Sequence, residues 1–297
     1  MLEDLGVLGV SGEDRQSWLN GMVTNDVAKL QPGARLEACF TNVKGKVVAL
    51  ADVWHAGDCL RVVTERERMG ALLAMLERLI VMEDVTIADA SADWSVLTVQ
   101  GPDAAAVLDR ASLAGLSSDR TGSGGVDLLV AAAESDEAIA RLVAAGAVLG
   151  SARDLDALRL EAGLSRWGID VTEELFPQEA RLEDRRVSFT KGCYVGQEPV
   201  TRLQSRGHAN RFLTLLDLAD GAAPAAGAVV RRDDAEVGRV TSAARGPTIG
   251  RTVALALVRR DAAQPGTNLT IDGLPATVAA GPFVPATSGA AVAPPAC

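Results

Sequence analysis

Residues 191–198 read Lys-Gly-Cys-Tyr-Val-Gly-Gln-Glu, and this octapeptide is the most informative stretch of the chain. Its two glycines give the backbone the freedom that a tight loop needs, and Pro199 directly after it is typical of the first turn of a helix. We therefore predict a loop that enters a helix at about residues 197–204.

The same octapeptide gathers reactive side chains. It contains an amine, a thiol, a phenol and a carboxylate, and Tyr194 is the only tyrosine in 297 residues. A helix start presents unpaired N–H groups, which favour a thiolate at Cys193 or a bound anion, and Lys191 adds a cation. These features predict a site around a reactive cysteine. On the octapeptide alone, a glycine-bounded loop with a buried cysteine is an equally good interpretation.

Composition argues against several classes of function. A formal charge of −10 repels nucleic-acid phosphates and anionic membranes, so we expect no direct nucleic-acid partner and no membrane partner. The N-terminus lacks the positive flank of a signal peptide and no apolar run is long enough to span a bilayer, which favours a cytoplasmic location. The four cysteines form no C-x-x-C pair and no H-E-x-x-H motif occurs, so no metal site is predicted.

Hydrophobic periodicity divides the chain near residue 215. Before that point short apolar strands mix with amphipathic helices without a regular βαβ rhythm, which predicts an α+β region. After it, short β-like runs are separated by Gly, Pro and Asp turns, as in a small barrel. We expect an α+β region over 1–215, a β-barrel over 216–285 and a flexible tail over 286–297. The Ser/Gly-rich segment 117–125 is expected to be an exposed loop.

Two further elements are candidates for ligand binding. Glu161 precedes Gly163 at a predicted helix end, where a carboxylate can accept paired hydrogen bonds from a pterin or amidine edge; the alternative is a solvated surface glutamate. A basic strip follows the octapeptide and contains no acid: Arg202, Arg206, His208 and Arg211. It suits the carboxylates of an anionic ligand, unless it is only a local fluctuation of charge in a loop.

Taken together, these segments resemble the YgfZ family, the folate-binding relatives of the glycine-cleavage T-protein. Besides the octapeptide, the resemblance rests on Trp18–Val27, Asn42–Lys46, Arg159–Gly163 and Gly238–Ser242 and covers nearly the whole chain. It implies a ring of three domains, two intertwined α+β domains and a C-terminal small β-barrel. Tetrahydrofolate or another folate derivative would sit in the central opening.

The departures from the T-protein pattern concern the reaction. In T-proteins an Asn-x-x-Gly-Gly hairpin is followed by a paired aspartate that handles the proton of the tetrahydrofolate amine. Alignment on Asn42 and Gly45 puts Ala49 and Leu50 at those positions, and neither side chain accepts a proton. We therefore expect no ordinary aminomethyltransferase. Asp52, on the same face of the strand as Leu50, is a substitute candidate.

The resemblance implies a folate-binding protein that supports the assembly or repair of iron–sulfur enzymes, and through them tRNA modification. Iron–sulfur enzymes or assembly proteins would be its partners. The alternatives are a tetrahydrofolate-dependent aminomethyltransferase, with Asp52 or Asp26 replacing the missing pair, and a non-enzymatic interaction scaffold. The residues expected to act in chemistry are Cys193, Lys191, Tyr194, Gln197 and Glu198. Those expected to hold folate are Glu161, Arg202, Asn25, Lys46 and Arg206.

Overall fold

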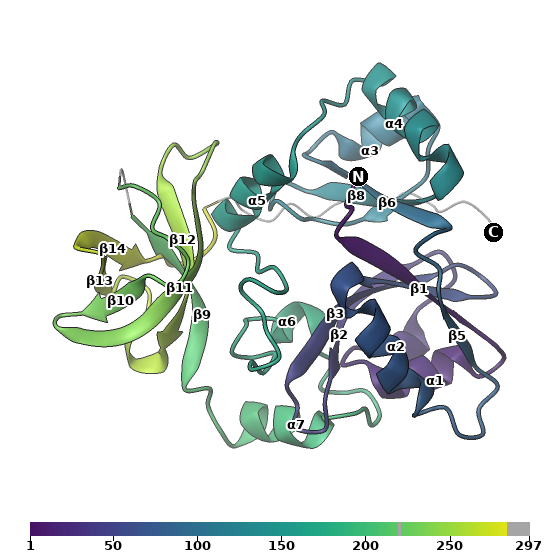
Figure 1. The fold of residues 1–297 in the computed structure, drawn as a ribbon, viewed down its shortest axis with the longest axis horizontal. Helices are drawn as coiled ribbons and strands as arrows, with labels where there is room; N and C mark the ends of the chain where they lie inside the picture. Colours follow the sequence, from purple (N-terminus) through teal and green to yellow (C-terminus); the bar gives the residue numbers. More distant parts are fainter. Residues whose placement is uncertain (219–220, 284–297) are drawn as a thin grey trace.

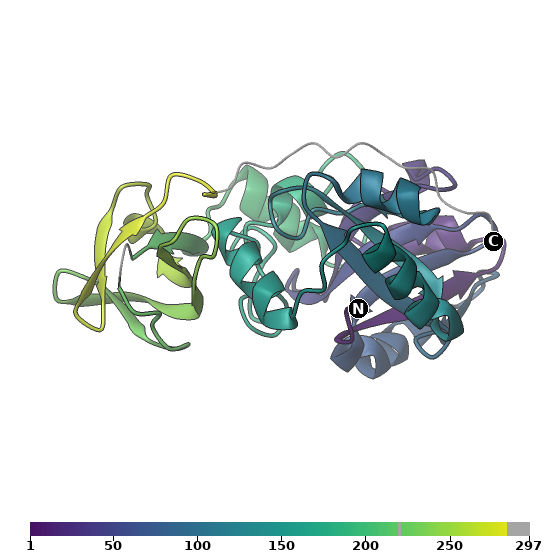
Figure 2. The same ribbon diagram turned by 90° about the horizontal axis from the view of Figure 1, so that it is seen from above.

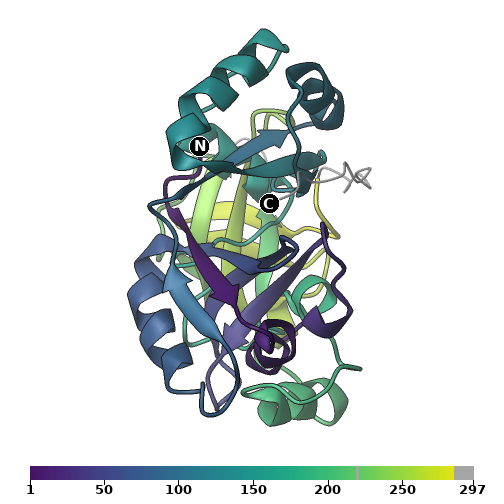
Figure 3. The same ribbon diagram turned by 90° about the vertical axis from the view of Figure 1, so that its right-hand side faces the viewer.

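The computed structural model describes residues 1–218 and 221–283, which form three bodies and a connecting segment (Figure 1). The first body spans residues 5–89, the second 94–144 and the barrel 211–278, with the connecting segment between the second body and the barrel. Figure 2 shows the barrel at one end of an elongated molecule and the other two bodies at the opposite end. In Figure 3 the second body lies above the first, and the barrel lies behind both.

The first body is a five-stranded antiparallel sheet in the order β2-β3-β4-β1-β5. Its strands are β1 (Leu5–Ser11), β2 (Arg35–Thr41), β3 (Val47–His55), β4 (Leu60–Glu65) and β5 (Thr86–Asp89). Helices α1 (Arg15–Met22) and α2 (Met69–Glu77) cover one face, where Trp18 and Leu76 pack against Ala51. Because side chains alternate along a strand, the opposite face carries Leu50 and Asp52. We call this opposite surface the cavity face.

The second body is a three-stranded sheet covered by two helices. Its elements are β6 (Trp94–Gln100), α3 (Ala104–Ala111), β7 (Leu116–Ser117), β8 (Gly125–Ala131) and α4 (Ser135–Ala144). The expectation of an exposed loop over 117–125 is wrong, because no residue of that segment is exposed and Ser118 and Thr121 are each 2% exposed. The glycines there permit close packing: a Cβ on Gly125 would lie 2.3 Å from the Gln100 side-chain nitrogen.

The connecting segment joins the second body to the barrel through α5 (Ala152–Glu161), α6 (Glu183–Arg186) and α7 (Gln197–Ser205). A capping box starts α5, in which Ser151 and Asp154 satisfy each other's backbone N–H groups. At its other end Leu160 is fully buried against Leu213 and Leu255 of the barrel. The helix therefore fixes the barrel to the rest of the molecule.

The barrel is closed by six strands in the order β10-β11-β12-β9-β14-β13. They are β9 (Arg211–Asp217), β10 (Val229–Arg232), β11 (Ala235–Arg245), β12 (Thr252–Arg259), β13 (Asn268–Ile271) and β14 (Leu274–Val278). The predicted α+β fold with a small C-terminal barrel is confirmed. The first barrel strand starts at Arg211, ahead of the boundary expected near 215, and the expected tail 286–297 lies outside the described residues.

Four short 3-10 turns complete the secondary structure of the described residues: η1 (Val27–Lys29), η2 (Arg66–Arg68), η3 (Ala132–Glu134) and η4 (Arg260–Ala262). None of the helices in this part of the chain combines the length and apolar character needed to cross a bilayer.

Candidate functional site

A cavity of about 1490 Å³ lies between the first body, the second body and the connecting segment. Its walls are the cavity face of β2, β3 and β4, residues 97–104 and 118–121 of the second body, and residues 146–152, 163–169 and 180–182 of the connecting segment. Typical small-molecule sites enclose about 300–1,000 Å³, so this cavity has room for a large ligand. Within the described residues, no group of three His, Cys, Asp or Glu side chains is placed to hold a metal ion.

Buried ion pairs cross the cavity between the first two bodies. Asp52 on β3 lies 3.0 Å from Arg35, 3.3 Å from Arg120 and 3.3 Å from Arg186. Arg120 also pairs with Asp127 of β8 at 2.6 Å. Burial alone would raise the pKa of the Asp52 carboxyl, but the three arginines hold that pKa well below its ordinary value. Asp52 is therefore an ionised anchor and a poor proton acceptor.

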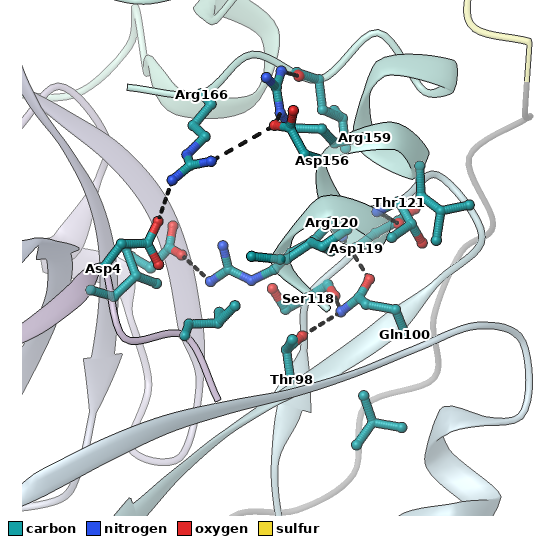
Figure 4. Close-up of a pocket in the computed structure, with 18 of the residues that line it drawn as sticks. Asp4, Thr98, Gln100, Ser118, Asp119, Arg120, Thr121, Asp156, Arg159 and Arg166 are labelled. Atoms are coloured by element: carbon teal, nitrogen blue, oxygen red, sulfur yellow. Dashed lines mark hydrogen bonds and ion pairs between the residues drawn. The ribbon is translucent and has the colours of Figure 1, made fainter. Parts of the chain in front are cut away.

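Another ion-pair network lines the wall nearest the connecting segment. Figure 4 shows Arg166 placed between Asp4 and Asp156. Its guanidinium lies 3.0 Å from the Asp4 carboxylate and 3.8 Å from that of Asp156. This ion pair therefore links the N-terminal residues of the chain to the connecting segment.

Gln100 organises the wall formed by the second body (Figure 4). Its side-chain amide donates to the Thr98 hydroxyl at 2.7 Å and to the Ser118 carbonyl at 2.9 Å, and its oxygen accepts the Arg120 backbone N–H at 2.8 Å. These residues were not singled out from the sequence. The available signal was the run of glycines around Gly125, which allows the close approach of Gln100.

Lys191 of the octapeptide is turned away from the cavity and toward the end of α1. Its ammonium donates to the backbone carbonyls of Asn20 at 2.5 Å, Val23 at 2.7 Å and Asn25 at 2.7 Å, and the residue is 8% exposed. An ammonium has three hydrogens, so its donor capacity is fully used. Lys191 therefore holds this turn in place through hydrogen bonds to the main chain, and we call this role a structural bracket.

Gly196 locks the octapeptide against the hairpin between β2 and β3. Its φ is +81°, and a Cβ there would lie 2.2 Å from the Asn42 carbonyl oxygen, so only glycine fits. Beside it, the Thr41 hydroxyl donates to the Val195 carbonyl at 2.5 Å. The loop and the hairpin are therefore packed as one unit.

The other four predicted reaction residues are also in this loop or the start of α7. Cys193 is exposed, whereas Tyr194 is 7% exposed and burial raises the pKa of its phenol to about 12. Gln197 donates to the Gly192 carbonyl at 3.4 Å, and Glu198 forms an exposed ion pair with the next turn of its helix. These residues follow one another along the loop and the start of α7, and none of them lines the cavity.

Glu161, predicted to hold a pterin edge, is fully buried, so the interpretation as a solvated surface glutamate is wrong. Its carboxylate accepts the backbone N–H groups of Thr248 at 2.8 Å and Ile249 at 3.3 Å, and it also accepts the Thr248 hydroxyl. A Cβ on Gly246 would lie 2.4 Å from this carboxylate. Glu161 therefore accepts paired hydrogen bonds, but the donors belong to a loop of the barrel.

The remaining predicted folate residues do not line the cavity either. The Lys46 ammonium lies 3.3 Å from the Glu179 carboxylate and 3.5 Å from the centre of the Phe176 ring. Glu179 also pairs with Arg211 at 3.1 Å. The Asn25 side chain donates to the Glu37 carbonyl at 2.7 Å.

Of the basic strip, Arg202 lies on α7 and Arg206 directly follows that helix. The Arg202 side chain is 68% exposed and pairs with Glu198, and Arg206 is exposed as well. The strip is therefore divided between a helix surface and the Arg211–Glu179 pair. None of the residues predicted from the sequence to hold folate lines the cavity. Most are held by partners outside it or face solvent, and the Asn25 amide is bonded to the backbone carbonyl of Glu37, a residue of the cavity wall.

Comparison with known proteins identifies two matching domains. Residues 2–120 match the GCVT N-terminal domain, and residues 211–285 match the glycine cleavage T-protein C-terminal barrel domain. Similar proteins include the aminomethyltransferase of Shouchella clausii, 29% identical over 90% of this chain and 80% of the relative, and that of Bacillus subtilis, 28% identical over 90% and 81%. The glycine cleavage system aminomethyltransferase T from Bartonella henselae has a TM-score of 0.83, with 22% identity, over 96% of this chain and 85% of that one.

These matches correct the expected function. The role in iron–sulfur enzyme assembly or repair, implied by the resemblance to the YgfZ family, is contradicted by relatives that cover nine-tenths of the chain and are named aminomethyltransferases. The expected T-protein architecture is confirmed by the solved structure of 0.83 TM-score. The two domains, the relatives and the fold agree, and the chain belongs to the glycine-cleavage T-protein superfamily.

Proposed function

We propose that this protein is a tetrahydrofolate-dependent aminomethyltransferase of the T-protein type, with its substrates bound in the central cavity. The observation that carries the proposal is that cavity, about 1490 Å³ in volume and lined in large part by residues 2–120, which match the GCVT N-terminal domain. Its volume accommodates a folate together with the group that is transferred. The names of the relatives supply the reaction class.

Arg181 is the residue best placed to bind a folate carboxylate. It lines the cavity, has a left-handed backbone with φ of 57°, and its guanidinium lies 4.1 Å from the centre of the Phe212 ring. It forms no ion pair with another described residue, unlike Arg35, Arg120 and Arg186. A guanidinium held against an aromatic ring is preorganised for two parallel hydrogen bonds to a carboxylate.

Calorimetric titration of tetrahydrofolate tests the binding site. Arg181→Ala is expected to weaken binding about tenfold, because a charge-assisted hydrogen bond contributes about 1.5–3 kcal/mol and a factor of ten is 1.4 kcal/mol. Arg206→Ala is the matched control, since Arg206 is exposed and lies outside the cavity lining. Its affinity should equal that of the wild type. Weaker binding by Arg206→Ala with no effect at Arg181 would place the folate on the basic strip instead.

The reaction is tested by measuring methylene-tetrahydrofolate and ammonia from an aminomethyl donor. Wild-type protein is expected to form both products in equal amounts. Tight folate binding without any turnover would refute the transferase proposal and leave the binding site standing.

A further inference from the structure

Three carboxylates line the cavity from the cavity face of the sheet: Glu37 on β2, Asp52 on β3 and Glu65 on β4. Glu37 lies 2.8 Å from Arg185 and 3.3 Å from Arg35. Arginines likewise surround Asp52, as described above. In the described part of the chain Glu65 has no ion-pair partner, so it is the one of the three whose charge is not fixed by an arginine.

Glu65 lies beside the strand position where an acid is missing. The backbone N–H of Leu50 donates to the Glu65 carboxyl oxygen Oε2 at 3.3 Å. Leu50 is one of the two residues that the sequence alignment places where T-proteins have paired aspartates. Comparison along β3 alone misses this carboxylate, because it reaches the same place from the neighbouring strand β4.

The Thr64 hydroxyl is a hydrogen-bond partner of Glu65. Its oxygen lies 2.6 Å from the Leu50 carbonyl and 3.1 Å from Glu65 Oε2, and Thr64 is 2% exposed. The Thr64 hydroxyl and the Leu50 N–H stabilise the ionised form of Glu65 by donating to its carboxylate. When Glu65 is protonated, the single hydroxyl hydrogen of Thr64 is donated to the Leu50 carbonyl, and the Thr64 oxygen accepts the proton of the acid. Both protonation states of Glu65 therefore have a hydrogen-bond partner.

The electrostatic surroundings keep both states accessible. Burial raises the pKa of the Glu65 carboxyl to about 7, although the Leu50 N–H, the Thr64 hydroxyl and the Arg186 guanidinium act in the opposite direction. Cys39 on β2 is the other titratable neighbour, and burial raises its pKa to about 12, so it stays neutral. Proton transfer is most effective when the group titrates near the working pH.

We propose that Glu65 is the catalytic acid–base group of this protein, a role that rests on the proposed aminomethyl transfer. An N–H nitrogen of the tetrahydropterin forms a bond to the methylene carbon of an aminomethyl donor, X–CH2–NH2, and the bond from that carbon to the amino nitrogen breaks. The Glu65 carboxylate takes the proton from the attacking nitrogen and gives it to the departing one. A second N–H nitrogen of the folate then forms a bond to the same carbon, the C–X bond breaks, and the proton of that nitrogen leaves with X as X–H. The products are methylene-tetrahydrofolate, ammonia and X–H, and nothing is oxidised or reduced.

The test compares Glu65→Gln with Glu77→Gln, a control at an exposed glutamate of α2 that lies outside the cavity lining. Glutamine at position 65 keeps an oxygen that accepts the Leu50 N–H but carries no titrating proton. We expect kcat to fall about 100-fold or more, tetrahydrofolate affinity to stay within about twofold, and the limb of the kcat–pH profile near pH 7 to disappear. Glu77→Gln should match the wild type in all three measurements.

The outcomes separate the two proposals. A Glu65→Gln variant that keeps kcat within about threefold and retains the pH limb would overturn the role of Glu65 while the transferase activity stands. An inactive wild type would overturn the proposed function and the role of Glu65 with it. Should Glu65→Gln fail to fold, the wild-type profile decides: a limb near pH 7 supports the proposal, and a flat kcat between pH 5.5 and 9 refutes it.

Discussion

Replacement of Lys191 by methionine tests whether the octapeptide is a structural bracket. Methionine has nearly the same length and keeps the apolar stem, but it removes the three hydrogen bonds to the carbonyls of Asn20, Val23 and Asn25. The Asn25 carbonyl also accepts the Val27 N–H at 3.1 Å, so it retains a partner. At pH 7 the lysine is charged, although burial lowers its pKa to about 8.

The cost follows from what remains buried. Leaving a buried polar group without a partner costs about 1–3 kcal/mol, and two carbonyls lose the ammonium as donor here. Burial of the ammonium in the wild type offsets part of that difference. We therefore expect Lys191→Met to lower the free energy of unfolding by about 3 kcal/mol, which corresponds to a fall in Tm of about 6–12 °C for a chain of this size.

Thermal unfolding followed by circular dichroism at pH 7 measures this effect, with Lys44→Met as the matched control. Lys44 is exposed on the adjacent hairpin, and exposed substitutions usually change stability by less than about 0.5 kcal/mol. The bracket argument is refuted if the Tm of Lys191→Met lies within about 2 °C of that of the control, which is about one-third of the smallest expected shift. Loss of turnover at unchanged Tm would support the reactive role predicted from the sequence.

Two further predictions concern buried groups outside the cavity chemistry. Asp170→Ala should lower the free energy of unfolding by about 3 kcal/mol in urea titrations, because Arg159 loses a buried partner at 2.7 Å and Thr241 loses an acceptor at 2.5 Å; an unchanged midpoint would contradict this. Iodoacetamide should modify the exposed Cys193 of the native protein and leave Cys39 unmodified until the protein is unfolded, since Cys39 is fully buried and its thiol pKa is raised to about 12. Peptide mass spectrometry measures both sites, and native labelling of Cys39 would show that this part of the sheet opens.

Much of the secondary structure was predictable because it depends on nearby residues. Short apolar runs before residue 215 predicted strands mixed with helices, and the structure has such strands, among them β2 at Arg35–Thr41. The turn residues after 215 predicted several short strands, which close into the barrel. The prediction of an exposed loop over 117–125 was wrong, because it also depended on local composition. The segment has the glycines and serines of an exposed turn, but Gly125 packs against Gln100.

The residues of the cavity could not be assembled from the sequence. Asp52 meets Arg120 and Arg186 across separations that no local pattern encodes, and Glu65 reaches Leu50 only because β3 and β4 are neighbours in the sheet. Lys191 shows the opposite problem, because a conspicuous cation in a conspicuous motif proved to be bound to backbone carbonyls.

The sequence by itself determined the α+β character, the barrel and the membership of the octapeptide in a tight, glycine-dependent loop. These properties follow from hydrophobic periodicity and from the spacing of glycines along the chain, although the contact that requires glycine at 196, with the Asn42 carbonyl, is a tertiary one. Only the tertiary structure decided which polar groups face the cavity and which are hydrogen-bonded to the main chain. Burial and hydrogen-bond partners come from segments far apart in the chain, and those partners set whether Lys191, Glu161 and Glu65 are anchors or candidates for chemistry.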